Sequence, residues 1–163
     1  MDAFWLAARL LLLLGVANTA PIGAKLLLGD RWSAPLDAGW RFRDGRPLLG
    51  RSKTLRGLVA AVACTGLAAT LLGLSPGLGA AFGAMAMVGD ALSSFIKRRL
   101  DIPSSGKATG IDQIPEALLP LLAVHGVLGL SLLQVAAITA LFFALEIPLA
   151  RLFFRFGMRD RPY

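Results

Sequence analysis

The sequence is poor in the residue types that build disulfides and nucleophilic active sites. Its 163 residues include a single cysteine, Cys64, and a single histidine, His125. A lone cysteine inside an apolar run excludes a disulfide framework and indicates a buried thiol. The chain offers no Ser-His-Asp or Cys-His set for covalent catalysis, and we expect His125 to have a structural or solvated role. Any chemistry must therefore rest on acidic and basic side chains.

Apolar residues are abundant instead, at 56% of the chain, and the mean hydropathy is +0.67. These values exclude an ordinary soluble domain. A membrane span needs roughly 20 apolar residues. The candidate stretches, of which the second and fourth are short, are 3–28, 57–74, 77–95, 112–128 and 131–154. We therefore predict an all-α integral membrane protein, with a single domain over residues 1–163 and about five transmembrane helices.

Positive charge lies in blocks between these stretches. Apart from one arginine near the N-terminus, all Lys and Arg residues fall within 25–56, 97–107 and 151–161. The turns at 74–78 and 125–131 carry none. By the positive-inside rule, this alternation predicts an N-terminus outside the cell membrane and a C-terminus in the cytosol. Because the basic residues lie between membrane spans, we expect them to attract lipid headgroups and other anions, and we expect no nucleic-acid binding.

The segment 29–56 is longer than an ordinary connection, which indicates a functional cytosolic loop. Turn signals at Asp37 and Asp44 favour a folded loop. Trp32 and Trp40 argue against disorder and predict that the loop folds onto the membrane face. We expect Asp37 and Asp44 chiefly to hold the shape of the loop, with substrate contact as a second role.

Asn18 and Pro21 interrupt the first apolar stretch. Proline removes a backbone donor and kinks a helix. An asparagine within a span must find a polar partner or a wet cavity. Two interpretations of Asn18 follow: it joins neighbouring helices by hydrogen bonds, or it forms part of the polar wall of a cleft that opens to the cytosol.

Lys53 and Arg56 stand three residues apart where the second span begins. The free N–H groups and the dipole of a helix N-terminus already favour an anion. Lysine adds a compact charge and arginine a bidentate fork, which together suit a polyphosphate. The run is not a P-loop, because its glycine spacing and a preceding strand are both missing.

Asp90 lies two helical turns inside the basic end of its span, with Lys97 on the same helical face. A carboxylate at that depth is costly in lipid, so we expect it to face a cavity. Asp112 opens the next span, and carboxylates from two helices under a basic rim suit Mg²⁺. The alternative is an internal ion pair between Asp90 and one of three basic side chains: Lys53, Arg56 or Lys97.

Short runs that combine these polar residues occur in a particular order: 17–21, 35–39, 42–46, 53–57, 89–90, 94–99 and 112–113, with a looser tail at 157–163. In this order they resemble the CDP-archaeol synthase family, a relative of the CDP-diacylglycerol synthases. The resemblance covers nearly the whole chain, and its most specific parts are 53–57 and 89–99. One departure concerns the second aspartate that the family has three residues after the position of Asp112. Here that position is Pro115, and the nearest acid, Glu116, is displaced by one residue.

The resemblance implies transfer of a cytidylyl group from CTP to a membrane lipid phosphate, either archaetidic-acid-like or phosphatidic acid, with release of pyrophosphate. In the mechanism that we derive from it, Asp90 and Asp112 hold Mg²⁺ against the triphosphate. Lys53 and Arg56 neutralise the pyrophosphate, and Lys97 binds either the lipid phosphate or the triphosphate.

The expected substrate contacts complete this set. Arg98 is expected to bind the lipid phosphate or the triphosphate, and Asn18 and Ser94 to line the headgroup cavity. Asp37 and Asp44 are the candidates for contact with the nucleotide. The resemblance leaves open the ether or ester linkage of the lipid and the oligomeric state.

Two other functions fit part of the pattern. A small anion transporter would also use intramembrane acids such as Asp90 and Glu146. A lipid-binding membrane protein without catalysis would use the basic loops alone. The long loop at 29–56 is hard to explain in a transporter, and binding of CTP in the presence of Mg²⁺ would separate the enzyme from both alternatives.

Overall fold

The computed structural model describes residues 2–155 and 157, apart from 104, 105 and 107. The regular elements of this part of the chain are the helices α1 (Ala3–Leu28), α2 (Leu55–Leu71), α3 (Pro76–Arg99), α4 (Gln113–Leu128) and α5 (Leu132–Arg155). Within the same residues β structure is limited to isolated bridges. The predicted all-α architecture is confirmed, and each helix agrees with a predicted span to within a few residues at either end.

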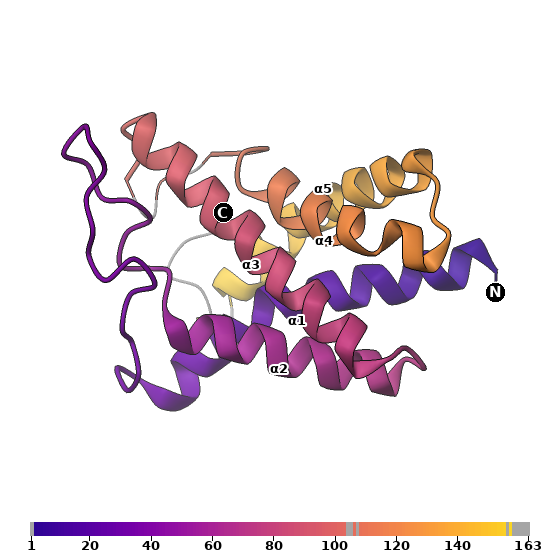
Figure 1. Ribbon diagram of the computed structural model, residues 1–163. Coiled ribbons are helices and arrows are strands. Elements are labelled where there is room, and N and C mark those ends of the chain that lie inside the picture. The colour runs from indigo at the N-terminus through magenta and orange to yellow at the C-terminus, as the bar shows by residue number, and fades with distance from the viewer. Residues whose placement is uncertain (1, 104–105, 107, 156, 158–163) are drawn as a thin grey trace.

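The helices run alternately up and down, so the connections gather at two ends (Figure 1). The N-terminus and the short α2–α3 and α4–α5 turns lie at one end. The α1–α2 loop (residues 29–54) and the α3–α4 connection lie at the other end. α3 packs extensively against both α2 and α4, whereas α1 packs mainly against α2 and only sparsely against α5. The basic residues of the first block, 25–56, and Lys97, Arg98 and Arg99 of the second therefore share one end of the molecule.

Two of the described helices are shorter than a usual span. α1, α3 and residues Leu132–Leu149 of α5 are long and apolar enough to cross a membrane. α2 has 17 residues and α4 has 16. Helices of that length measure about 24–26 Å, against a hydrocarbon core of about 30 Å. α2 and α4 are therefore shorter than the hydrocarbon core is thick.

The apolar core occupies the half of the bundle that holds the N-terminus. Leu10 and Leu14 of α1 pack in one cluster with Phe82 of α3 and with Val135 and Phe142 of α5. On α1 the cluster ends at Leu14, and on α5 it ends, among the described residues, at Phe142. The other half of the bundle is therefore free to hold polar side chains.

Glycines let α3 approach its neighbours α2 and α4 closely. A Cβ atom at Gly83 would lie 2.8 Å from the Ala61 carbonyl oxygen of α2. At Gly89 it would overlap the backbone of Pro115 and Glu116 at the start of α4. Gly89 therefore brings the neighbouring Asp90 up against the first turn of α4.

Cys64 corrects one expectation, because its side chain is exposed and not buried. The buried stripe of α2 runs through Ala61, Thr65 and Ala69 and faces α3. Cys64 lies outside that stripe, on a face that the bundle leaves uncovered. Apolar composition alone did not reveal this, because lipid-facing and buried faces of a membrane helix are equally apolar.

The α1–α2 loop is folded and closes on itself. The Leu36 N–H donates to the Lys53 carbonyl over 2.8 Å, and the Leu55 N–H donates to the Ala34 carbonyl over 3.0 Å. Its far end is held on α3 by Arg99, which stacks on the Phe42 ring at 4.7 Å and lies 3.1 Å from an Asp44 oxygen. These contacts fix the position of the residues that precede α2.

Candidate active site

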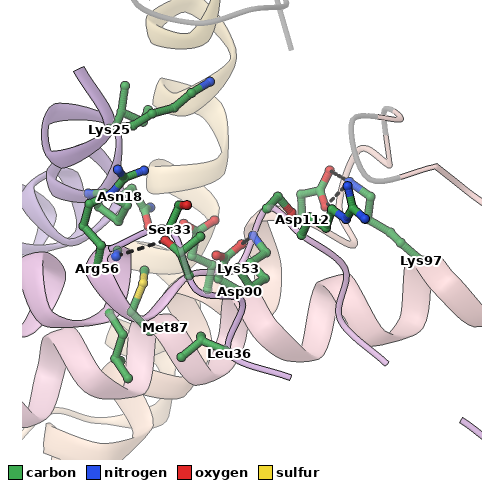
Figure 2. A pocket seen from close by; sticks show the side chains of 18 of the residues that line it. Asn18, Lys25, Ser33, Leu36, Lys53, Arg56, Met87, Asp90, Lys97 and Asp112 are labelled. Atoms are coloured by element: carbon green, nitrogen blue, oxygen red, sulfur yellow. Dashed lines mark hydrogen bonds and ion pairs between the residues drawn. The ribbon is translucent and has the colours of Figure 1, made fainter. Parts of the chain in front are cut away.

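A cavity of about 640 Å³ lies at the end of the bundle that carries the α1–α2 loop, a size usual for small-ligand sites. All the described helices and the loop contribute to its wall. Figure 2 shows side chains from these elements converging on it. Its charged lining residues are Lys25, Asp30, Arg51, Lys53, Arg56, Asp90, Lys97, Asp112, Glu116 and Glu146.

Two helices begin at this cavity. Thr54 is the N-cap of α2 and accepts a hydrogen bond from the Gly57 N–H over 3.2 Å. α4 begins at Gln113, directly after Asp112, and both residues line the cavity. Helix N-termini carry partial positive charge and unpaired N–H groups. The cavity therefore receives two helix ends that favour an anion.

Lys53 and Asp90 form an ion pair inside the cavity, with Lys53 Nζ 2.5 Å from Asp90 Oδ1 (Figure 2). Both side chains are largely covered, at 19% and 27% exposed. The sequence offered an ion pair with Lys53 as the alternative role of Asp90, and this contact is the pair in question. Both partners also line the cavity, so the pairing is compatible with the predicted roles of both residues in a ligand site.

Lys97 and Asp112 form a second pair. Lys97 Nζ lies 2.9 Å and 3.1 Å from the two carboxylate oxygens of Asp112. The Ser93 hydroxyl donates to the Gly89 carbonyl over 2.9 Å and lies 3.3 Å from the Asp112 carbonyl. The cavity thus holds two lysine–aspartate pairs, each joining α3 to a segment at the start of another helix.

Arg56 lines the cavity but also has a second role. Its Nη1 donates to the Gly29 carbonyl and, over 2.9 Å, to the Arg31 carbonyl. The side chain is buried at 8% exposed. Its position at the start of α2 therefore ties the end of α1 to α2, which the sequence did not predict.

Asn18 also faces the cavity, from the middle of α1. Both polar atoms of its amide are buried, and neither has a hydrogen-bond partner among the residues that the structure describes. An unsatisfied buried amide costs about 1–3 kcal/mol. This geometry favours the polar-wall interpretation over a hydrogen bond between helices.

Four of the predicted substrate contacts lie outside the cavity lining: Asp37, Asp44, Ser94 and Arg98. Asp44 binds Arg99, and Ser94 and Arg98 are buried along α3. Arg98 is turned away from the cavity face because it follows Lys97 directly, and a helix turns by about 100° per residue.

Asp37 acts as an internal support of the loop. Its carboxylate accepts backbone hydrogen bonds from Gly39, Leu49 and Gly50 over 2.9–3.0 Å. Burial by itself raises the pKa of the Asp37 carboxyl, but these backbone donors outweigh it, so the pKa lies below the ordinary value of 3.8. Asp37 is therefore ionised at neutral pH and fixes the chain just before Lys53.

The cavity also includes charged residues that the sequence reasoning did not select. Lys25 lies seven residues after Asn18, a spacing that places both on one helical face. Arg51 lies two residues before Lys53 in the segment that leads into α2. The helical spacing could have identified Lys25, whereas Arg51 lies in irregular backbone whose direction only the structure reveals.

The donor set fits a magnesium ion that also has phosphate ligands. Asp90 and Asp112 line one cavity from neighbouring elements. Among the residues described, no group of three or more His, Cys, Asp or Glu side chains could hold a metal. Mg²⁺ is usually held by one or two carboxylates, several waters and substrate phosphates. Two carboxylates are therefore sufficient for a metal that arrives with a nucleotide, and insufficient for a closed structural site.

The fold and this cavity define a helical membrane protein with a charged cavity suited to phosphate groups. Residues 5–80 and 74–163 match the family model described as CarS-like, CDP-archaeol synthase. The chain belongs to the CDP-archaeol synthase family. It is thus an integral membrane enzyme, which confirms the resemblance and favours catalysis over the transporter and the lipid-binding alternative.

Individual relatives agree with this assignment. The CDP-archaeol synthase of Pyrococcus furiosus is 35% identical over 127 residues, which are 69% of this chain and 68% of the relative. That of Methanopyrus kandleri is 38% identical over 108 residues, 60% of this chain and 58% of the relative. A solved structure of an intramembrane enzyme for archaeal membrane lipid biosynthesis superposes with a TM-score of 0.72, at 31% identity, over 88% of this chain and 91% of that one.

Proposed function

We propose that the protein transfers the cytidylyl group of CTP to a membrane lipid phosphate, giving a CDP-lipid and pyrophosphate, and that the reaction requires Mg²⁺. The observation that carries the proposal is the cavity at the starts of α2 and α4 with its two lysine–aspartate pairs. Family membership supports the same reaction. The lipid in this proposal is an archaetidic-acid-like phosphate, with phosphatidic acid as the alternative that the assay below decides.

The reaction needs no strong base. A phosphate monoester has a second pKa near 6, so the lipid phosphate already carries an oxyanion at neutral pH. One of its oxygens attacks the α-phosphorus of CTP. The bond from that phosphorus to the α–β bridging oxygen breaks, and the electron pair leaves with pyrophosphate. Positioning and charge neutralisation are therefore the tasks of the protein.

The described side chains are arranged for these tasks. Lys53 and Arg51, with the N-terminus of α2, would bind the β- and γ-phosphates and stabilise the departing pyrophosphate. Lys97, which lies beside the start of α4, would bind a further phosphate group of the substrates. A Mg²⁺ held by Asp90 and Asp112 would supply further neutralisation of the triphosphate. As these ligands bind, each lysine would exchange its aspartate partner for a phosphate oxygen, and each aspartate would exchange its lysine for the metal ion.

We place the cavity on the cytosolic side of the membrane. The α1–α2 loop and the end of α3 carry the two basic blocks and border the cavity, and basic loops remain in the cytosol. Arg159 and Arg161, which extend the third basic block, lie outside the described residues. CTP is made in the cytosol, so this orientation gives it direct access.

Purified protein in detergent tests the proposal. Release of pyrophosphate would be followed with CTP, Mg²⁺ and either a diether or a diester glycerol lipid phosphate. We expect turnover that depends on CTP, on Mg²⁺ and on lipid, and that is greater with the diether lipid. ATP in place of CTP serves as the matched control. Absence of turnover with every lipid, together with absence of CTP binding in the presence of Mg²⁺, would refute the proposal.

A further inference from the structure

A polar stripe on α1 enters the cavity at a distance from the two lysine–aspartate pairs. Asn18, Ile22 and Lys25 are spaced by four and three residues and share one face of the helix, and all line the cavity. Figure 2 shows Lys25 and Asn18 on one side of the cavity and the Lys53–Asp90 and Lys97–Asp112 pairs on the other. The stripe therefore forms a polar region separate from the proposed triphosphate site.

This side of the cavity lies between α1 and α5. The two helices share the apolar core only as far as Leu14 and Phe142. Beyond these residues, the cavity is lined by Asn18 and Lys25 from α1 and by Glu146 from α5. In the half of the bundle that lacks a shared core, both helices thus contribute residues to the cavity wall.

Lys25 marks the point where the cavity reaches the outer surface of the bundle. Its side chain is exposed and also belongs to the cavity wall. The next residues, Leu26 and Leu27, are 56% and 87% exposed. Lys25 therefore lies where the cavity opens to the outer surface of the bundle, next in sequence to exposed leucines.

We propose that Lys25 and Asn18 bind the phosphate of the lipid substrate, which enters from the bilayer between α1 and α5. This rests on the proposed function and assigns a subsite to its second substrate. A phosphate held there keeps its hydrocarbon chains beside α1 and α5, while its oxygen points across the cavity to the nucleotide. The lysine supplies charge, and the Asn18 amide, which has no hydrogen-bond partner among the described residues, supplies a donor.

The structural alternative is that Lys25 only stabilises the end of α1. A lysine in the last turn of a helix interacts favourably with the helix dipole and can extend to the headgroups. That role would affect stability or insertion, and it would not distinguish one substrate from the other. Kinetics with both substrates varied therefore separates the two roles.

The test compares Lys25→Gln with Arg43→Gln, which removes an exposed cation from the same basic block but outside the cavity. For Lys25→Gln we expect the KM for lipid phosphate to rise about tenfold or more, as for one lost charge-assisted hydrogen bond. The KM for CTP and the melting temperature should stay unchanged. Asn18→Ala should also raise the KM for lipid phosphate. Arg43→Gln should change neither the KM for lipid phosphate nor the KM for CTP.

Direct binding without CTP gives an independent readout. Native mass spectrometry would compare a short-chain lipid phosphate with glycerol phosphate, which has the same headgroup chemistry and no chains. We expect the lipid phosphate to bind, glycerol phosphate to bind at least tenfold more weakly, and Lys25→Gln to weaken the first. Equal binding of both compounds would overturn entry from the bilayer, and a rise in the KM for CTP alone would overturn the assignment of Lys25. If the wild type binds lipid phosphate through Lys25 but transfers nothing, the proposed function fails while the subsite remains.

Discussion

Lys53 and Asp90 are 37 residues apart in sequence and 2.5 Å apart in space. The pair joins the end of the α1–α2 loop to the interior of α3, inside the cavity and beside the N-terminus of α2. A buried carboxylate and a buried ammonium each need a partner. When a triphosphate and its metal enter, each partner can be replaced by an ion of the same sign. The effects expected below for Asp90→Asn and Lys53→Ala depend on this exchange of partners.

Asp90→Asn should abolish turnover while the protein still folds. The substitution removes one negative charge with little change in volume and leaves Lys53 without its counter-ion. Turnover per folded molecule, with folding followed by gel filtration in detergent, measures the effect. Asp101→Asn is the matched control, because the Asp101 side chain is 82% exposed and lies outside the cavity lining. Retained activity per folded molecule, with loss of folded protein, would assign Asp90 a purely structural role.

Lys53→Ala should lower kcat/KM for CTP by about tenfold to a hundredfold. One charge-assisted hydrogen bond contributes about 1.5–3 kcal/mol, and the loss falls on the triphosphate. The KM for lipid should change much less. Initial rates with each substrate varied in turn measure both constants. An unchanged dependence on CTP, combined with poor membrane insertion, would make Lys53 a topology determinant and not a phosphate ligand.

Arg56→Lys should lower the melting temperature by roughly 2–10 °C. A lysine keeps the charge but cannot reach both the Gly29 and Arg31 carbonyls from one planar group. A hydrogen bond lost at one of these part-buried carbonyls costs about 1–3 kcal/mol, and in a chain of this size 1 kcal/mol is worth about 2–4 °C. Thermal unfolding followed by tryptophan fluorescence measures the shift. An unchanged melting temperature with a raised KM for CTP would place the role of Arg56 in phosphate binding alone.

Asp37→Asn should remove an acid-sensitive contribution to the stability of the α1–α2 loop. The folded pKa of Asp37 lies below its ordinary value of 3.8, so the contribution is fully present above that value and is lost as the pH falls below it through the folded pKa. Limited proteolysis of the loop between pH 5 and pH 2.5, with an acid-tolerant protease, measures it. The wild type should become sensitive only below about pH 4, whereas the variant should be sensitive throughout. Identical profiles would contradict this role.

Cysteine labelling in intact cells should reveal the orientation in the membrane. In a Cys64→Ala background, Ser75→Cys and Ser131→Cys should react with an impermeant maleimide, because both residues are exposed at the end of the bundle that holds the N-terminus. Arg43→Cys in the α1–α2 loop should react only after the cells are opened. The opposite pattern would move the cavity to the outer side of the membrane.

The helices were predictable because each follows from a local property of the chain. Long apolar runs and the breaks at Gly29 and Gly129 are visible in the sequence, and so is the weakness of the second and fourth spans. Candidate site residues were predictable where a polar side chain interrupts an apolar helix, as at Asn18 and Asp90, because such a residue is too costly to face lipid. The family pattern added Lys53, Lys97 and Asp112.

Other features depend on which helices are neighbours. The exposure of Cys64 and the absence of Arg98 from the cavity wall depend on how each helix is rotated about its axis. Both faces of a membrane helix are apolar, so the sequence does not indicate which face is turned toward the protein interior. Arg56 also holds the end of α1 by donating to two backbone carbonyls. Every residue has such a carbonyl, so the sequence does not show which ones Arg56 contacts.

The sequence by itself determined the helical class, the order of the spans and the gathering of basic residues between spans, because hydropathy and charge act locally along the chain. The order of its short polar motifs indicated the family. Only the tertiary structure decided that Lys53 pairs with Asp90 and Lys97 with Asp112, and that Lys25 shares the cavity with both pairs. These contacts join distant segments, and the close approach at Gly89 sets α3 against the start of α4, where Asp112 lies. Backbone proximity of that kind arises from packing, which no single stretch of sequence encodes.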